Sequence, residues 1–197
     1  MEVSADAAAV GRVRNACAKL GVKNSLMIVS QPELLSAVRL SVLKELLAMG
    51  HHGVYISLSK PHTAIEHMLE KHGIDTSKMY YVDCISTSAH PRHGQKHSRV
   101  LHVASPERIS DAGVLSGEIE RFIRGVSHPK FIVVDTIRTM SLYHHPKVVA
   151  SLVSRLEKIA LEIRAKLVLL TIPHGGNVSL HALLPLFDMV IDISGSD

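Results

Sequence analysis

Short runs of consecutive apolar residues alternate along the chain with longer stretches in which apolar residues recur every three to four positions. The runs are about strand length and rich in branched side chains: residues 26–29, 54–58, 80–85, 131–134, 167–170 and 189–193, with a weaker run at 100–104. Because the runs are continuous rather than alternating with polar residues, both faces of each strand should be covered. The pattern predicts the central strands of a mostly parallel sheet.

Helical periodicity fills the segments between these runs. It predicts helices within residues 34–49, 65–72, 119–124 and 149–163, and a short helix around 10–20. Glycine follows the first three of the longer helices, as is common where a helix ends. Strands and helices in alternation predict an α/β fold: a doubly wound, mostly parallel sheet in a three-layer α/β/α arrangement.

The chain length favours one folding unit. With 197 residues and a mass of 21.5 kDa, the chain can bury one sizeable core. Residues 1–24 are expected to form an N-terminal helix and lead-in, and residues 25–197 the α/β domain. Apolar residues make up 46% of the chain but aromatic residues only 4%, so the core should be aliphatic.

Composition also bears on the cellular compartment and on the kind of partner. There is no signal-peptide pattern, and proline and glycine interrupt the longest uncharged stretch, residues 167–187, so no membrane helix is expected. Two cysteines without CxxC spacing fit a reducing cytoplasm. A net charge of +4 and 14 histidines permit an anionic partner without requiring one.

Three segments carry a family resemblance. GVYISLSKPHTAIEHMLEKHGIDTSKMYYVDCIS (53–86), FIVVDTIRTM (131–140) and KLVLLTIPHG (166–175) resemble, in their order and character, the KaiC-like branch of the RecA-fold ATPases. The resemblance covers residues 23–193. It implies a RecA-like P-loop NTPase fold, ATP binding and often hydrolysis, and assembly into rings or filaments. Asp135 and Thr136 match the Walker B pair that holds Mg²⁺, although an aspartate at a strand end also commonly turns the chain.

The phosphate loop departs from the family pattern. A Walker A loop, GxxxxGK[ST], uses glycines to point backbone amides at the phosphates and a lysine to reach the outer ones. The equivalent stretch here, VSQPELLSAVRLS (29–41), contains neither glycine nor lysine. Ser30, Gln31, Pro32 and Glu33 stand in its place with the S-x-x-E spacing of a helix capping box. We therefore expect the amides to be used by the chain itself, and Glu33 to repel phosphate.

A second departure concerns catalysis. In active KaiC-like ATPases the strand that matches GVYISL leads into acidic residues that activate the attacking water. This chain has Ser59 and Lys60 there, and neither can replace a carboxylate as a base.

The polar stretch between residues 86 and 99 offers two further candidate sites. His90, His93 and His97, preceded by Cys84, have side chains that suit Zn²⁺, but the pattern lacks a matched second half, and we do not assign zinc on it. Arg92, Lys96 and Arg99 form a basic patch that could dock an acidic or phosphate-bearing partner. The plain alternative for both is a solvated surface loop.

The sequence thus predicts a catalytically inactive KaiC/RecA-like domain with a regulatory or scaffolding role, acting through a protein partner or self-association and without an assigned cofactor. The first alternative is a divergent ATP-binding protein or weak ATPase that binds ATP and Mg²⁺ with Asp135. The second alternative is a nucleic-acid-binding module that uses the basic patch.

Overall fold

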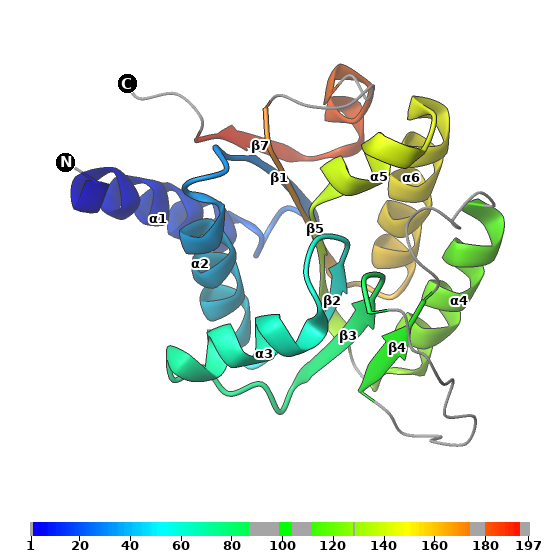
Figure 1. Ribbon diagram of the computed structural model, residues 1–197, viewed down its shortest axis with the longest axis horizontal. Helices are drawn as coiled ribbons and strands as arrows, with labels where there is room; N and C mark the ends of the chain where they lie inside the picture. The colour runs from blue at the N-terminus through cyan, green and yellow to red at the C-terminus, as the bar shows by residue number, and fades with distance from the viewer. Residues whose placement is uncertain (1, 87–98, 104–111, 128, 174–179, 194–197) are drawn as a thin grey trace.

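The computed structural model describes residues 2–86, 99–103, 112–127, 129–173 and 180–193. In this part of the chain a single sheet is covered by helices on both faces (Figure 1). The predicted three-layer α/β/α fold is therefore confirmed. Among the described residues, no helix is both long enough and apolar enough to cross a membrane.

Seven strands form the sheet in the order β4-β3-β2-β5-β6-β1-β7, and every neighbouring pair is parallel. Their bounds are Ser25–Val29 (β1), His52–Ser57 (β2), Met79–Asp83 (β3), Val100–His102 (β4), Pro129–Asp135 (β5), Lys166–Thr171 (β6) and Met189–Asp192 (β7). All six predicted strands are present, and the weak seventh run forms β4 at one edge of the sheet.

The helices lie between the strands in sequence. Their bounds are Glu2–Lys19 (α1), Leu35–Ala48 (α2), His62–Lys71 (α3), Ala112–Gly125 (α4), Ile137–Tyr143 (α5) and Pro146–Glu162 (α6), with 3₁₀ turns at Leu180–Ala182 (η2) and Leu184–Leu186 (η3). The sequence did not predict α5, because a seven-residue helix is too short to show a helical period. The first helix is also longer than expected and begins at Glu2.

Each face of the sheet carries its own apolar core. One core packs against α1, α2 and α3, and the other against α4, α5 and α6 (Figure 1). Both are mainly aliphatic, as the composition predicts. Tyr55, Tyr81 and Phe131 are aromatic exceptions, and all three lie in the core on the α1–α3 side.

A row of buried polar side chains crosses the sheet at its carboxyl edge. Ser57 at the end of β2 lies in register with Asp83 on β3 on one side and with Asp135 on β5 on the other. All three are buried. Side chains two positions apart on a strand lie on the same face of the sheet. Ser57, Asp83 and Asp135 therefore point toward the layer of α1–α3, as Tyr55 and Tyr81 do. In parallel α/β sheets this edge is where ligands commonly bind.

Candidate functional site at the carboxyl edge of the sheet

Asp135, the Walker B-like residue, forms a closed network with two side chains from other elements. Arg39 of α2 places its Nε 2.5 Å from the Asp135 Oδ2 atom and 3.0 Å from the Tyr55 hydroxyl oxygen. The Tyr55 hydroxyl in turn donates to the same Oδ2 atom. The side chains of Arg39 and Asp135 are 2% and 0% exposed. We call Arg39, Tyr55 and Asp135 the buried triad.

The local sequence explains why an arginine is buried here. Arg39 lies four residues after Leu35 and four before Leu43, so it shares the inward face of α2 with Leu43. Sequence reasoning missed Arg39 and Tyr55. The available signal was a cation inside an otherwise apolar helical stripe, which requires a buried partner of opposite charge.

Two members of the triad, Arg39 and Tyr55, have fixed protonation states. Burial works to lower the pKa of Arg39, but the Asp135 carboxylate and the Tyr55 oxygen outweigh burial and raise that pKa above its usual value. Burial, followed by the charge of Asp135, raises the pKa of Tyr55 well above 10.0. Tyr55 therefore remains a hydrogen-bond donor and Arg39 a cation at every physiological pH.

The residues present at this position do not fit Mg²⁺. Magnesium prefers six oxygen ligands and usually keeps several of its waters. Asp135 is buried and its Oδ2 atom already receives two donors, so only its Oδ1 atom, which has no hydrogen bond from any described residue, could offer an oxygen to a cation. Thr136 is also buried, at the start of α5, and the peptide bond that joins it to Asp135 is cis. The guanidinium of Arg39 occupies the place of a cation beside this carboxylate.

The capping box predicted at Ser30 is wrong. Helix α2 begins at Leu35, and its N-cap residue is Leu34, which has no side-chain cap. The Ser30 amide donates to the Thr171 carbonyl oxygen at 2.9 Å, and its hydroxyl donates to the Gln31 carbonyl oxygen at 3.1 Å. Ser30 therefore continues the pairing of β1 with β6 instead of starting the helix.

The turn between β1 and α2 is nevertheless closed by its own backbone. The Leu34 amide donates to the Gln31 carbonyl oxygen at 3.2 Å, and the Leu35 amide donates to the Pro32 carbonyl oxygen at 3.4 Å. In a phosphate loop, amides in this position point toward the ligand. Here two of them donate to carbonyl groups of the same turn.

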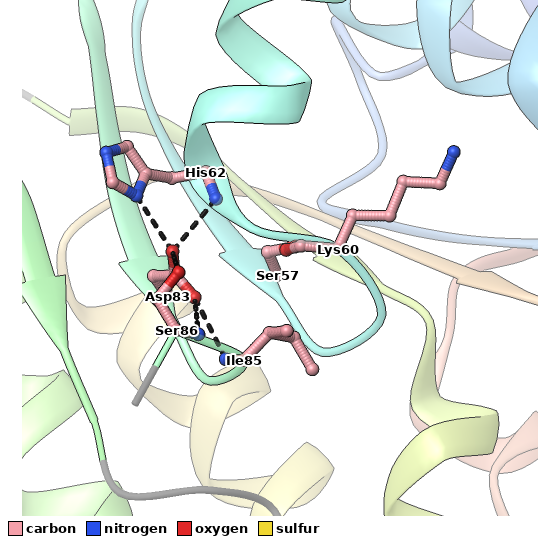
Figure 2. A network of polar contacts seen from close by, with 6 residues as sticks. All are labelled: Ser57, Lys60, His62, Asp83, Ile85 and Ser86. Carbon is pink, nitrogen blue, oxygen red and sulfur yellow. Dashed lines mark hydrogen bonds and ion pairs between the residues drawn. The ribbon is translucent and has the colours of Figure 1, made fainter. Parts of the chain in front are cut away.

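Ser59 and Lys60 lie in the exposed connection between β2 and α3. The Lys60 carbonyl oxygen accepts a hydrogen bond from the Ser57 hydroxyl. The Lys60 side chain extends away from Asp83 (Figure 2). That these two residues replace a catalytic carboxylate remains a prediction.

Asp83 lies across β2 from Asp135 and is held by backbone amides, a hydroxyl and an imidazole. Its Oδ2 atom accepts from the His62 amide at 2.9 Å, and it lies 2.8 Å from both the His62 Nδ1 atom and the Ser86 hydroxyl oxygen. Its Oδ1 atom accepts from the amides of Ile85 at 2.9 Å and Ser86 at 2.8 Å. Figure 2 shows these donors converging on the carboxylate.

These donors keep Asp83 ionised although it is buried. Burial alone would raise the pKa of Asp83, but the amides of His62 and Ser86, the imidazole of His62 and the Ile85 amide lower it well below 3.8. The neighbouring imidazole of His62 is 16% exposed, so this group reaches solvent on one side.

His102 completes the group around Asp83. It lies on β4 in register with Asp83, it is exposed, and its ring packs edge-on against the ring of His62 with 5.3 Å between centroids. In the part of the chain that the structure describes, His62, Asp83 and His102 are the group of His, Cys, Asp and Glu side chains placed closely enough to share a metal ion. Sequence reasoning missed this group, because its members come from three separate elements.

The histidines predicted as metal ligands, His90, His93 and His97, lie outside the described residues, as do Arg92 and Lys96. Cys84 is buried in the opposite core, and burial raises the pKa of its thiol to about 12, so this side chain is not available as a thiolate ligand. Arg99 of the basic patch donates to the Thr76 carbonyl oxygen at 2.7 Å and pairs with Glu66 at 3.8 Å.

Comparison with known proteins identifies the fold. No protein-family profile and no curated protein matches the chain. Among solved structures, it is similar to the KaiC-like protein PH0186 from the hyperthermophilic archaeon Pyrococcus horikoshii OT3, with a TM-score of 0.57 and 15% sequence identity. The match covers 86% of this chain and 71% of that protein. The chain therefore has the RecA-like fold of a KaiC-like protein, and at this identity the similarity concerns the fold alone.

Proposed function

We propose that the chain is a catalytically inactive KaiC/RecA-like domain with a regulatory or scaffolding role through protein contacts. The observation that carries this proposal is the ion pair between Arg39 and Asp135 in the core. The residue that matches the Mg²⁺-binding aspartate of the family already has a permanent cation from its own chain.

The electrostatics oppose a second cation. Two unit charges 4 Å apart interact with about 4 kcal/mol when the effective dielectric constant is about 20, and Mg²⁺ carries twice that charge. A magnesium ion beside Asp135 would therefore be repelled by Arg39 unless the arginine left the core. The closed turn at residues 31–35 adds to this argument, because two of its amides already donate to the turn itself.

An exposed apolar pair supports a role in protein contacts. Leu142 and Tyr143 end α5, the short helix that follows Asp135, and they are 60% and 50% exposed. Large apolar side chains that are adjacent and exposed can form part of a protein–protein contact surface. We assign this surface to contact between copies of the chain.

Titration of the purified chain with Mg·ATP by calorimetry tests the loss of nucleotide chemistry. We expect no saturable binding in the micromolar range, which corresponds to about −8 kcal/mol. Micromolar binding to the unaltered chain would overturn the proposal and favour the divergent ATPase. Titration with DNA or RNA at low salt is a parallel control, since steeply salt-dependent binding would favour the nucleic-acid alternative.

Sedimentation across a range of protein concentrations tests the contact surface. We expect concentration-dependent association that weakens in the double variant Leu142→Ser/Tyr143→Ser, because its buried contact area becomes polar. Leu161→Ser is the matched control, since Leu161 is a similarly exposed apolar residue on α6. A chain that remains monomeric at every concentration would contradict self-association.

A further inference from the structure

We propose that His62, Asp83 and His102 form a binding site for one divalent transition-metal ion, such as Zn²⁺. This site is separate from the buried triad, and the proposal does not depend on the proposed function. Each residue offers one ligand atom, and these three atoms lie within 4.8 Å of one another.

The fold itself brings the three side chains together. Parallel pairing of β3 with β4 places His102 in register with Asp83. Helix α3 begins at the carboxyl edge of the same sheet, and His62 is its first residue. The three side chains thus come from two strands and one helix, β3, β4 and α3. Such rigid elements position ligands more accurately than loops do.

The chemistry of the set suits a transition metal. Two imidazoles and one carboxylate are a common ligand set for zinc and for non-haem iron, with solvent in the remaining positions. Neither cysteine belongs to the set, so the site does not require a thiolate.

Asp83 is positioned independently of the imidazole it faces. The carboxylate accepts hydrogen bonds from the Ile85 amide, the Ser86 amide and the Ser86 hydroxyl, none of which involves the His62 ring. The His62 amide adds a fourth contact. The 2.8 Å between His62 Nδ1 and Asp83 Oδ2 is shorter than the separation of about 3.4 Å between two ligands of a tetrahedral metal with bonds of about 2.1 Å, so the two side chains must move apart by about half an ångström to admit an ion. A metal ion bound to both atoms would take the place of the hydrogen bond between them, with the neutral imidazole of His62 carrying its one proton on Nε2.

His102 distinguishes a metal site from a helix cap. Asp83 accepts the first amide of α3, which is an ordinary capping role and needs no second histidine. His102 contributes nothing to that cap, yet its ring lies edge-on against His62 at the exposed end of the group. Together with the partial exposure of His62, it gives an ion a path of entry from solvent.

Metal titration of the full chain, freed of metal with a chelator, tests the site. We expect one Zn²⁺ or Co²⁺ per chain, with Co²⁺ giving a visible absorption band. His102→Ala and His62→Gln should each weaken binding by about tenfold or more, since even residues that only support a ligand cost that much. Zn²⁺ should also raise the midpoint of thermal unfolding of the unaltered chain but not of His102→Ala. His67→Ala is the matched control, an exposed histidine on the same helix, and it should bind normally.

His102 is exposed, so His102→Ala is expected to fold, which circular dichroism will verify. The absence of stoichiometric binding, or unchanged affinity in His102→Ala, would overturn the proposal. It would also be overturned if the triple variant His90→Ala/His93→Ala/His97→Ala lost the metal while His102→Ala kept it. The Mg·ATP titration does not depend on these residues, so failure of one proposal is distinguishable from failure of the other.

Discussion

Asp135 and Asp83 end two strands that flank β2, in one row and on one face of the sheet, yet their surroundings differ. Asp135 is paired with a buried guanidinium. Asp83 is held by backbone amides, a hydroxyl and an imidazole, and one side of its group reaches solvent. The two aspartates occupy equivalent positions on the sheet, so their different surroundings come from their partners and not from their place at a strand end.

The two kinds of partner have different energetic consequences. A buried ion pair is costly to break, because removing one member leaves the other charged in the core. Amide and hydroxyl donors carry no net charge, so losing the carboxylate leaves several unsatisfied donors but no buried ion.

Replacing Asp135 should have the largest effect. In Asp135→Ala the guanidinium of Arg39 stays in the core without a counter-charge, and we expect a loss of about 3–5 kcal/mol in the free energy of unfolding. Denaturant titration followed by circular dichroism measures this loss. A change below about 1 kcal/mol would show that the pair is not buried in solution.

Asp83→Asn should have an intermediate effect, about 1.5–3 kcal/mol, because the variant loses the charged acceptor of several hydrogen bonds but keeps one oxygen in place. The same denaturant titration, with a chelator present, measures it. A loss as large as that of Asp135→Ala would remove the distinction between the two aspartates.

Acid should also destabilise the chain through Asp83. The pKa of Asp83 is lowered by folding, so its contribution to stability is fully present above its ordinary pKa of 3.8 and is lost as pH falls toward the lowered value. Stability of the unaltered chain should therefore fall below about pH 4 more steeply than that of Asp83→Asn. Parallel curves for the two proteins would contradict the assignment.

Tyr55→Phe should have the smallest effect. It removes one hydroxyl from the triad but leaves Arg39 and Asp135 paired, and we expect a loss of about 1 kcal/mol. Thermal unfolding monitored by calorimetry is sensitive enough to detect this change. A loss near that of Asp135→Ala would mean that the hydroxyl, and not the guanidinium, holds the carboxylate.

The backbone could be predicted largely from local pattern. Continuous apolar runs identify the inner strands of the parallel sheet, because both of their faces are covered, whereas the edge strands β4 and β7 are partly exposed. Helical periodicity identifies the longer helices. Helix α5 is too short to show a period. The predicted stripe at 34–49 matches α2, but the capping box at Ser30 was predicted wrongly, because the pairing of Ser30 with Thr171 on β6 overrides the local capping signal.

The site could be predicted only in part. The sequence singles out Asp135, but not its pairing with Arg39 and Tyr55, which depends on how α2 packs on β2 and β5. Likewise, His62 and His102 are far apart in sequence and meet only through the order of the strands. Contacts of this kind are tertiary, and a local pattern does not encode them.

A double-mutant cycle between Arg39 and Asp135 measures whether this carboxylate is bound to a cation of its own chain. The free energies of unfolding of Arg39→Met, Asp135→Leu and the double variant would be compared with that of the unaltered chain. We predict a coupling energy of about 2–3 kcal/mol, with the double variant more stable than Asp135→Leu alone. Additive losses, within about 0.5 kcal/mol, would contradict the pairing and leave Asp135 available for another cation.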